Sequence, residues 1–168
     1  DAMAGELSGV DLTEVITINH DLVSSYNADG YSEVVKQVIE SESPQTIVIG
    51  HSYQTRDFMP RVSAKLDIPF IPDIISMDDG IVKQVLNAKL NALVTTSADQ
   101  VILSFQSATF SEEAMVTGSC LARSIEVNLD SSIVRSEAED PFQEDAGDVD
   151  LESAELIVSI GRGIEKEE

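Results

Sequence analysis

The chain has 168 residues, 42% of them apolar, and a formal net charge of −21 from 31 acidic and 10 basic side chains. This length suffices for one domain with a substantial core, or for one domain and part of another. The charge argues against nucleic acid, whose phosphates would be repelled, and against anionic membrane surfaces. No apolar run approaches the ~18 residues of a membrane-spanning helix. We therefore expect no nucleic-acid partner and no membrane insertion.

Cysteine and histidine are too scarce for the commonest metal and nucleophile sites. Cys120 is the only cysteine, so the chain can form no intrachain disulfide and no cysteine-based metal cluster. His20 and His51 are the only histidines and lie far apart in the sequence. We therefore expect no catalytic residues and no bound metal, because no nucleophile has a base and an orienting residue in an evident pattern.

The first elements alternate between strand and helix. Residues 15–18 are all β-branched, which predicts a strand. Apolar residues at helical spacing predict a helix from 31 to 41, with Asp29 as its N-cap. The continuous apolar run 47–49 predicts a second strand, buried on both faces as in a parallel sheet.

A helix follows this second strand after a polar loop. We expect it over residues 56–66, with one apolar face made of Phe58, Met59, Val62 and Leu66. Because proline is tolerated only in a first turn, the regular helix should begin close to Pro60. A further apolar run starts at residues 74–75. The stretch from 47 to 77 therefore predicts one βαβ unit.

The loop between this strand and helix is a candidate for ligand contact, because open α/β sheets bind ligands at the carboxyl ends of their strands. Ser52, Thr55 and Arg56 offer two hydroxyl groups and a cation to a small anion. The alternative is an ordinary helix start, in which Thr55 caps the helix and Arg56 pairs with a nearby acid.

From residue 78 onward, strand follows strand. A tight turn at residues 78–80 is followed by short apolar runs at 81–86, 92–96 and 101–105, and a further strand is expected at 125–129. This succession indicates an antiparallel edge on a mostly parallel sheet. The expected fold class is α/β: three layers, a mostly parallel sheet with helices on both faces, and an antiparallel strand edge.

The composition changes near residue 136. Between 136 and 155 the chain has many acidic residues and no basic one, which is typical of a solvated linker. The apolar run 156–160 then predicts a new buried strand. It is followed by Gly161-Arg162-Gly163, which resembles half of a nucleotide-binding turn, since glycines let a backbone approach a phosphate closely. The alternative is an ordinary turn that ends a strand.

Three segments resemble, in the right order, parts of the alpha subunit of electron transfer flavoproteins. The run 50–66 is similar to the family's first-domain motif: a strand ending in Gly, a small-residue loop, Arg-Asp, two apolar residues, Pro-Arg, and a helix ending in Leu. Residues 72–75, Pro-Asp-Ile-Ile, look like the family's Asp-containing strand. The run 150–163 is similar to the segment that opens the family's flavin domain. The resemblance spans roughly Leu7 to the end of the chain.

This resemblance implies an electron carrier rather than an enzyme. In the family, the alpha subunit pairs with a beta subunit, and the pair holds one FAD, mainly in the alpha subunit's C-terminal domain. The pair accepts electrons from acyl-CoA or other dehydrogenases and passes them to a quinone reductase or another acceptor. By the same resemblance, Arg162 would lie at the FAD, with Gly161 and Gly163 beside it. The implied compartment is the cytoplasm of a bacterium or archaeon, or the mitochondrial matrix of a eukaryote.

The resemblance also implies domain limits. Residues 1–135 would be the N-terminal α/β domain without its first βαβ portion, acting mainly as a scaffold for the heterodimer. Residues 136–152 would be an acidic linker, and 153–168 the first strand and turn of a truncated FAD-binding domain. We therefore expect this chain alone to bind FAD poorly. Gln106 stands where the family usually has Arg, and Ile160 where it usually has Gly.

Two other functions remain open from the sequence. One is an adenine-nucleotide-binding module that uses the loop from Gly50 to Asp57, because the family's beta subunits bind AMP in a related domain. The other is a flavin-free assembly domain of a degenerate paralogue.

Overall fold

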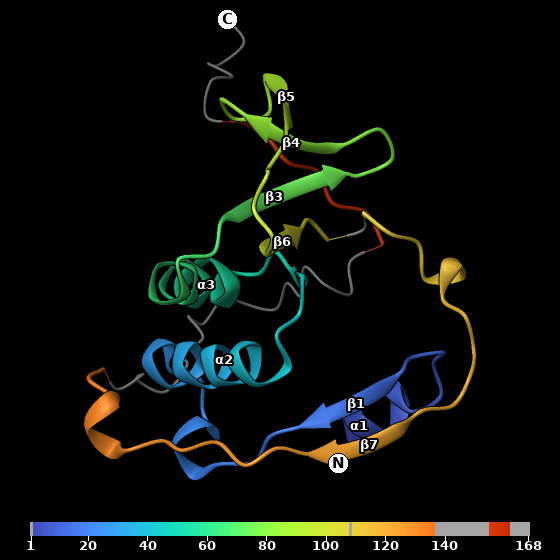
Figure 1. Ribbon diagram of the computed structural model, residues 1–168. Helices are drawn as coiled ribbons and strands as arrows, with labels where there is room; N and C mark the ends of the chain where they lie inside the picture. Colours follow the sequence, from blue (N-terminus) through green and yellow to red (C-terminus); the bar gives the residue numbers. More distant parts are fainter. Residues whose placement is uncertain (1, 108, 137–154, 162–168) are drawn as a thin grey trace, which may run out of the picture. The chain divides into compact units, whose positions relative to one another are not determined.

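A computed structural model describes residues 2–107, 109–136 and 155–161 of the chain (Figure 1). The chain divides into two compact units, residues 1–138 and residues 139–168. The helices and strands of the described part all lie in the first unit.

The main sheet of the first unit is mixed. Its strands are β2 (Thr46–Gly50), β3 (Phe70–Ser76), β4 (Ile81–Val85), β5 (Leu90–Val94) and β6 (Val101–Phe105), in the order β2-β6-β3-β4-β5. Strand β6 pairs in parallel with β2 and β3, whereas β4 pairs antiparallel with β3 and β5. The predicted α/β class, with an antiparallel edge on a parallel sheet, is confirmed.

The helices are α1 (Ala2–Leu7), α2 (Ala28–Glu42) and α3 (Tyr53–Leu66), with short 3-10 turns η1 (Asp21–Val23), η2 (Glu112–Ala114) and η3 (Ser131–Ile133). A small parallel sheet joins β1 (Glu14–Thr17) to β7 (Leu121–Ser124). Figure 1 shows α2 and α3 stacked between this small sheet and the main sheet.

The core lies between α2, α3 and one face of the main sheet. Its buried members are Ala28, Ile39, Phe58, Met59, Val62, Ile68 and Ile102. The predicted apolar face of α3 is confirmed, because Phe58, Met59 and Val62 are all buried there. A second cluster on the other face of the sheet consists of Ile71, Ile74, Leu103 and Phe105.

Both long helices begin earlier than predicted. Asn27, rather than Asp29, caps α2: its Oδ1 accepts the Gly30 N–H at 2.7 Å. The prediction that α3 starts near Pro60 is also wrong, because α3 begins at Tyr53 and Pro60 lies inside it. The Pro60 ring is on the exposed side of the helix, and burial of the neighbouring core face keeps the helix continuous across it.

Three strand predictions were wrong in burial or position. Val48 of β2 is 62% exposed, because one face of β2 is left uncovered rather than buried as predicted. Residues 125–129 form no strand, and β7 lies just before them. Residues 156–160 also form no strand in the described part, where their apolar side chains have no paired strand beside them and are exposed.

Candidate functional site

The carboxyl ends of β2, β6 and β3 bring four polar side chains together. His51 directly follows β2, Ser104 lies near the end of β6, Gln106 follows β6, and Asp73 lies in β3 where its register with β6 shifts. Parallel strands end at one edge of a sheet, so the topology itself gathers these residues. We call these four residues the strand-end network.

Short hydrogen bonds connect the strand-end network. His51 Nδ1 lies 2.8 Å from Ser104 Oγ, and the backbone N–H of Asp73 donates to the same hydroxyl at 3.3 Å. Gln106 Nε2 donates to Asp73 Oδ1 at 2.9 Å, which also lies 3.5 Å from His51 Nε2. Asp73 has a left-handed backbone (φ 68°), so these bonds hold a conformation that non-glycine residues rarely adopt.

Serine, histidine and aspartate are the residue types of a catalytic triad, but this arrangement does not present a nucleophile. Ser104 is 0% exposed, so a substrate carbonyl has no access to its hydroxyl. That hydroxyl also accepts the N–H of Asp73, which ties it to the neighbouring strand. We therefore interpret the strand-end network as a structural hydrogen-bond network that joins the ends of three strands.

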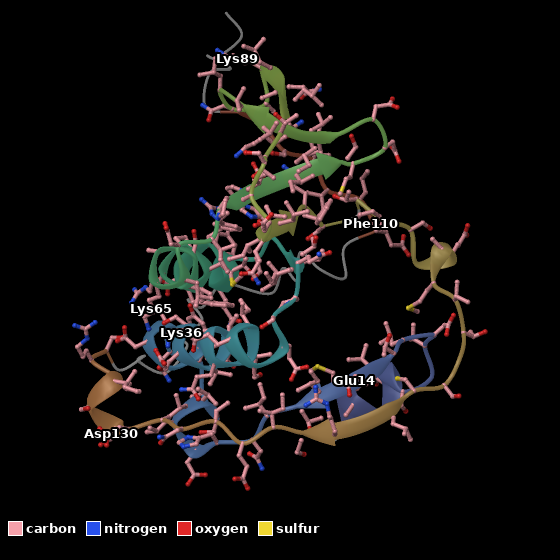
Figure 2. All side chains as sticks on the ribbon, in the orientation of Figure 1. Glu14, Lys36, Lys65, Lys89, Phe110 and Asp130 are labelled. Atoms are coloured by element: carbon pink, nitrogen blue, oxygen red, sulfur yellow. The ribbon has the colours of Figure 1, made fainter. Side chains whose placement is uncertain are left out.

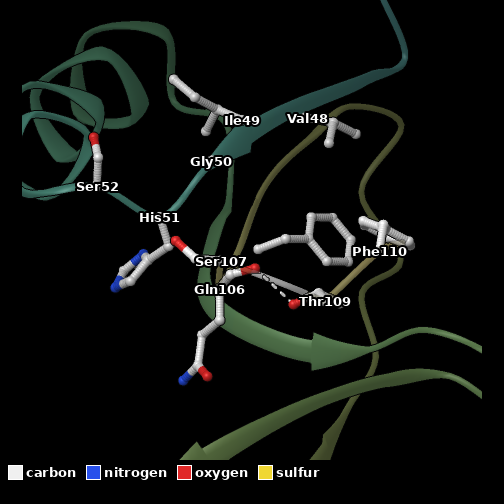
Figure 3. A pocket seen from close by; sticks show the side chains of 10 residues that line it. Val48, Ile49, Gly50, His51, Ser52, Gln106, Ser107, Thr109 and Phe110 are labelled. Atoms are coloured by element: carbon white, nitrogen blue, oxygen red, sulfur yellow. Dashed lines mark hydrogen bonds between the residues drawn. The ribbon is translucent and has the colours of Figure 1, made fainter. Parts of the chain in front are cut away.

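A hollow of about 360 Å³ lies at the same sheet edge (Figure 3). Val48, Phe105 and Phe110 supply its apolar wall, and the two phenylalanine rings lie 5.1 Å apart between centroids. Thr109 Oγ1 donates to the carbonyl oxygen of Gln106 at 2.7 Å, which closes the loop after β6. Figure 3 shows the Gln106 side chain pointing away from Val48 and Phe110.

The side chains of the predicted anion loop, Ser52, Thr55 and Arg56, do not converge on one point. Ser52, not Thr55, is the N-cap of α3, and its Oγ accepts the N–H of Thr55 at 3.1 Å. Thr55 is buried, and its hydroxyl donates to the carbonyl of Gly50 at 2.7 Å. Arg56 lies over the exposed ring of Tyr53, 5.8 Å from its centroid. The geometry therefore favours the ordinary helix start among the two alternatives.

A charged cluster between α2 and α3 was not predicted. Arg61 Nη1 lies 3.0 Å from Asp29 Oδ1, and the backbone N–H of Arg135 donates to Asp29 Oδ2 at 3.0 Å. This hydrogen bond is the main reason why the pKa of Asp29 is lowered. Lys65, labelled in Figure 2, lies 3.0 Å from Glu33 and lowers the pKa of that carboxyl. A hollow of about 620 Å³ lies over the cluster.

Two of the three predicted cofactor residues, Arg162 and Gly163, lie outside the described residues. Gly161 is described and exposed.

Among the described residues, no group of three or more His, Cys, Asp or Glu side chains is arranged to hold a metal ion. No helix in those ranges is both long enough and apolar enough to cross a membrane.

Residues 1–130 match the family model described as the electron transfer flavoprotein domain, and the chain belongs to this family. It is alpha-subunit-like: it is 28% identical to electron transfer flavoprotein subunit alpha of Bacillus subtilis (strain 168) over 173 residues, 99% of this chain and 53% of that protein.

Two other relatives show how varied the matching proteins are. Acryloyl-CoA reductase electron transfer subunit beta of Anaerotignum propionicum is 26% identical, over 98% of this chain and 54% of that protein. Protein FixB of Clostridium saccharobutylicum is 23% identical, over 92% of this chain and 49% of that protein. The chain therefore spans about half the length of the curated relatives it matches.

Proposed function

We propose that this chain is the first-domain part of an electron transfer flavoprotein alpha subunit, which carries electrons by FAD and turns over no substrate of its own. The match to the Bacillus subtilis alpha subunit carries this proposal, because it extends over 99% of the chain. Acyl-CoA or other dehydrogenases would be the donors, and a quinone reductase the acceptor. The proposed compartment is the bacterial or archaeal cytoplasm, or the mitochondrial matrix in a eukaryote.

The role of the first unit, in this proposal, is to scaffold a heterodimer with a beta subunit. Exposed apolar side chains support such a role. Leu86, Leu90 and Leu93 of the β4–β5 hairpin are 68%, 57% and 66% exposed. Exposed apolar side chains gathered on one element can mark a protein interface. We propose that this hairpin contacts the beta subunit.

FAD is proposed to bind mainly outside the first unit, with Gly161, Arg162 and Gly163 as its contacts from this chain. A guanidinium beside the flavin or its phosphates would favour their negative charge. The domain limits proposed are residues 1–135, a linker over 136–152, and the start of a flavin domain over 153–168. The cofactor supplies the redox chemistry, and the protein binds and orients it.

Co-purification tests the scaffold. The chain would be expressed with the beta subunit from the same genome, and the visible spectrum of the purified material would be recorded. We expect the beta subunit to be retained, and the double substitution Leu90→Glu, Leu93→Glu to abolish retention. Leu121→Glu is the matched control, because Leu121 is 83% exposed on β7 rather than on the hairpin. Retention that survives the hairpin substitutions would disprove this surface.

The spectrum separates the remaining possibilities. We expect the isolated chain to carry little flavin, so stoichiometric flavin on it would contradict the proposal. A flavin-free complex, even with a full-length alpha subunit present, would favour an assembly domain. The adenine-nucleotide alternative has less support, because the Arg56 guanidinium lies over the ring of Tyr53 and the Thr55 hydroxyl is bonded to the Gly50 carbonyl. Calorimetry with AMP and with ATP tests it, and an absence of heat would remove it.

A further inference from the structure

A segment that follows β7 runs along α2 in the opposite direction. We call residues 125–136 of this segment the strap. Figure 1 shows its orange ribbon passing along α2 towards η3. Three contacts mark its course. Arg123 of β7 forms an ion pair with Glu42 at the end of α2. Further along, Asn128 is hydrogen-bonded to Gln37 in the middle of the helix. Arg135 is hydrogen-bonded to Asp29 near the start of the helix.

The Gln37 side chain pairs with the strap as a strand backbone would. The N–H of Asn128 donates to Gln37 Oε1 at 2.9 Å, and Gln37 Nε2 donates to the carbonyl oxygen of Asn128 at 2.8 Å. One amide side chain therefore satisfies both backbone groups of a single strap residue. This reciprocal pair fixes the register of the strap against α2.

Asp29 holds the far end of the strap. Its carboxylate is buried, with the whole residue 8% exposed, and each oxygen has its own partner. Oδ1 accepts from Arg61 of α3, whereas Oδ2 accepts the N–H of Arg135 at 3.0 Å. A hydrogen bond to an ionised acceptor is stronger than a neutral one. The same bond keeps the pKa of Asp29 low, which is consistent with a carboxylate at neutral pH.

These two side chains supply the hydrogen bonds that attach the strap beyond Ile125. The N–H of Ile125 donates to the carbonyl oxygen of Thr17, the last residue of β1. Within the described residues, Gln37 and Asp29 supply the only hydrogen bonds that join residues 126–136 to the rest of the first unit. The other bonds of that range are local to η3, where Asp130 caps the turn.

We propose that Gln37 and Asp29 are positioning residues that clasp the strap and thereby set the point from which the following acidic stretch departs. If both contacts open, the last hydrogen-bonded anchor of the segment moves back to Ile125, and roughly 35 Å of chain is freed when extended. The proposal depends only on contacts within the first unit, so its failure would leave the proposed electron carriage untouched.

Amide hydrogen exchange, measured by NMR on the whole chain, tests each contact. Asp29→Ala should speed exchange of the Arg135 amide by about tenfold or more, given the strength of hydrogen bonds to charged groups. Asp57→Ala is the matched control, because Asp57 also pairs with Arg61 but makes no contact with the strap. Gln37→Leu should speed exchange of the Asn128 amide by a similar factor. Lys36→Leu is its control and should leave that exchange unchanged, because Lys36 is one position away and pairs with Glu33 and Glu40.

The Leu103 amide of β6 reports global unfolding, because Leu103 is 1% exposed in the other core cluster. Its exchange should stay unchanged in the variants, and tryptic cleavage after Arg135 should accelerate together with amide exchange. If Asp29→Ala also speeds exchange of the Leu103 amide, that substitution has destabilised the whole first unit. The comparison of Asn128 amide exchange in Gln37→Leu and Lys36→Leu then tests the proposal. Equal exchange in each variant and its control, or an Arg135 amide that already exchanges like free chain in the unsubstituted protein, would overturn the proposal.

Discussion

Replacing Ser104 with alanine tests whether the strand-end network stabilises the first unit. The substitution removes the hydroxyl that bonds His51 Nδ1 at 2.8 Å and accepts the Asp73 N–H at 3.3 Å. Ser104 is 0% exposed, so water cannot replace the lost partner at that point. A buried polar group left without a partner costs about 1–3 kcal/mol. We expect the free energy of unfolding to fall by that amount.

Urea unfolding followed by circular dichroism measures this change, with Ser107→Ala as the control. Ser107 lies three residues further on, is exposed, and its side chain has no hydrogen bond among those described. In thermal unfolding, the midpoint should drop by about 2–4 °C for each kcal/mol lost. If Ser104→Ala and Ser107→Ala unfold at the same urea concentration, the strand-end network contributes nothing and the reasoning is refuted.

The left-handed backbone of Asp73 allows a second check in the same assay. Ser104→Ala removes one of the bonds that hold Asp73 at φ 68°. Glycine adopts this conformation without the steric penalty of about 1–2 kcal/mol that other residues incur. Asp73→Gly should therefore cost less stability in the Ser104→Ala background than in the unsubstituted protein. Equal costs in both backgrounds would show that the two residues are uncoupled.

Three further predictions concern packing and ionisation. Ile102→Ala, at a fully buried position of β6, should lower the free energy of unfolding by about 2–5 kcal/mol, whereas Val48→Ala on the exposed face of β2 should change it by less than about 0.5 kcal/mol; equal effects in urea unfolding would contradict the assigned core. Burial, and then the hydrogen bond to Asp57, raises the pKa of Tyr26 to about 12, so in an ultraviolet pH titration Tyr26 should ionise near that value, and Asp57→Ala should lower it. The pKa of Asp29 is lowered in the folded state, so its stabilising contribution is complete above the ordinary aspartate value near ~3.9 and is lost as pH falls through the lower folded pKa. The stability difference between the unsubstituted protein and Asp29→Asn should therefore shrink in that acidic range, and a difference that grows there would contradict the assignment.

The elements that sequence predicted well are those set by local periodicity. The apolar face of α3 follows from the spacing of Phe58, Met59 and Val62, and the change from alternating elements to successive strands predicted the antiparallel edge. The predicted burial of β2 on both faces was wrong because a continuous apolar run does not reveal whether both faces of a strand are covered. The start of α3 was predicted too late because a buried helix face can offset the backbone hydrogen bond that is lost at Pro60, and the local sequence does not show this burial.

The strand-end network and the strap could not be predicted from local pattern. His51, Asp73 and Ser104 are separated by tens of residues, and only the strand order β2-β6-β3 brings them to one edge. Their one signal in the sequence was position, since His51 lies two residues after the predicted strand 47–49 and Gln106 directly follows the predicted strand 101–105. Asp29 had the right chemistry for a cap, but its partners, Arg61 and Arg135, come from distant parts of the chain.

The acidic charge of the chain opposes association between molecules through the edge of β2. Among the described residues, β2 pairs only with β6, and its sequence TIVIG contains neither proline nor lysine to discourage a further strand. Edges of this kind are templates for pairing between molecules. The net charge of −21 opposes the approach of a second copy, and this repulsion weakens as salt shortens the Debye length from about 8 Å to about 3 Å at 1 M. The chain should therefore remain dispersed at physiological salt and self-associate through β2 in concentrated salt.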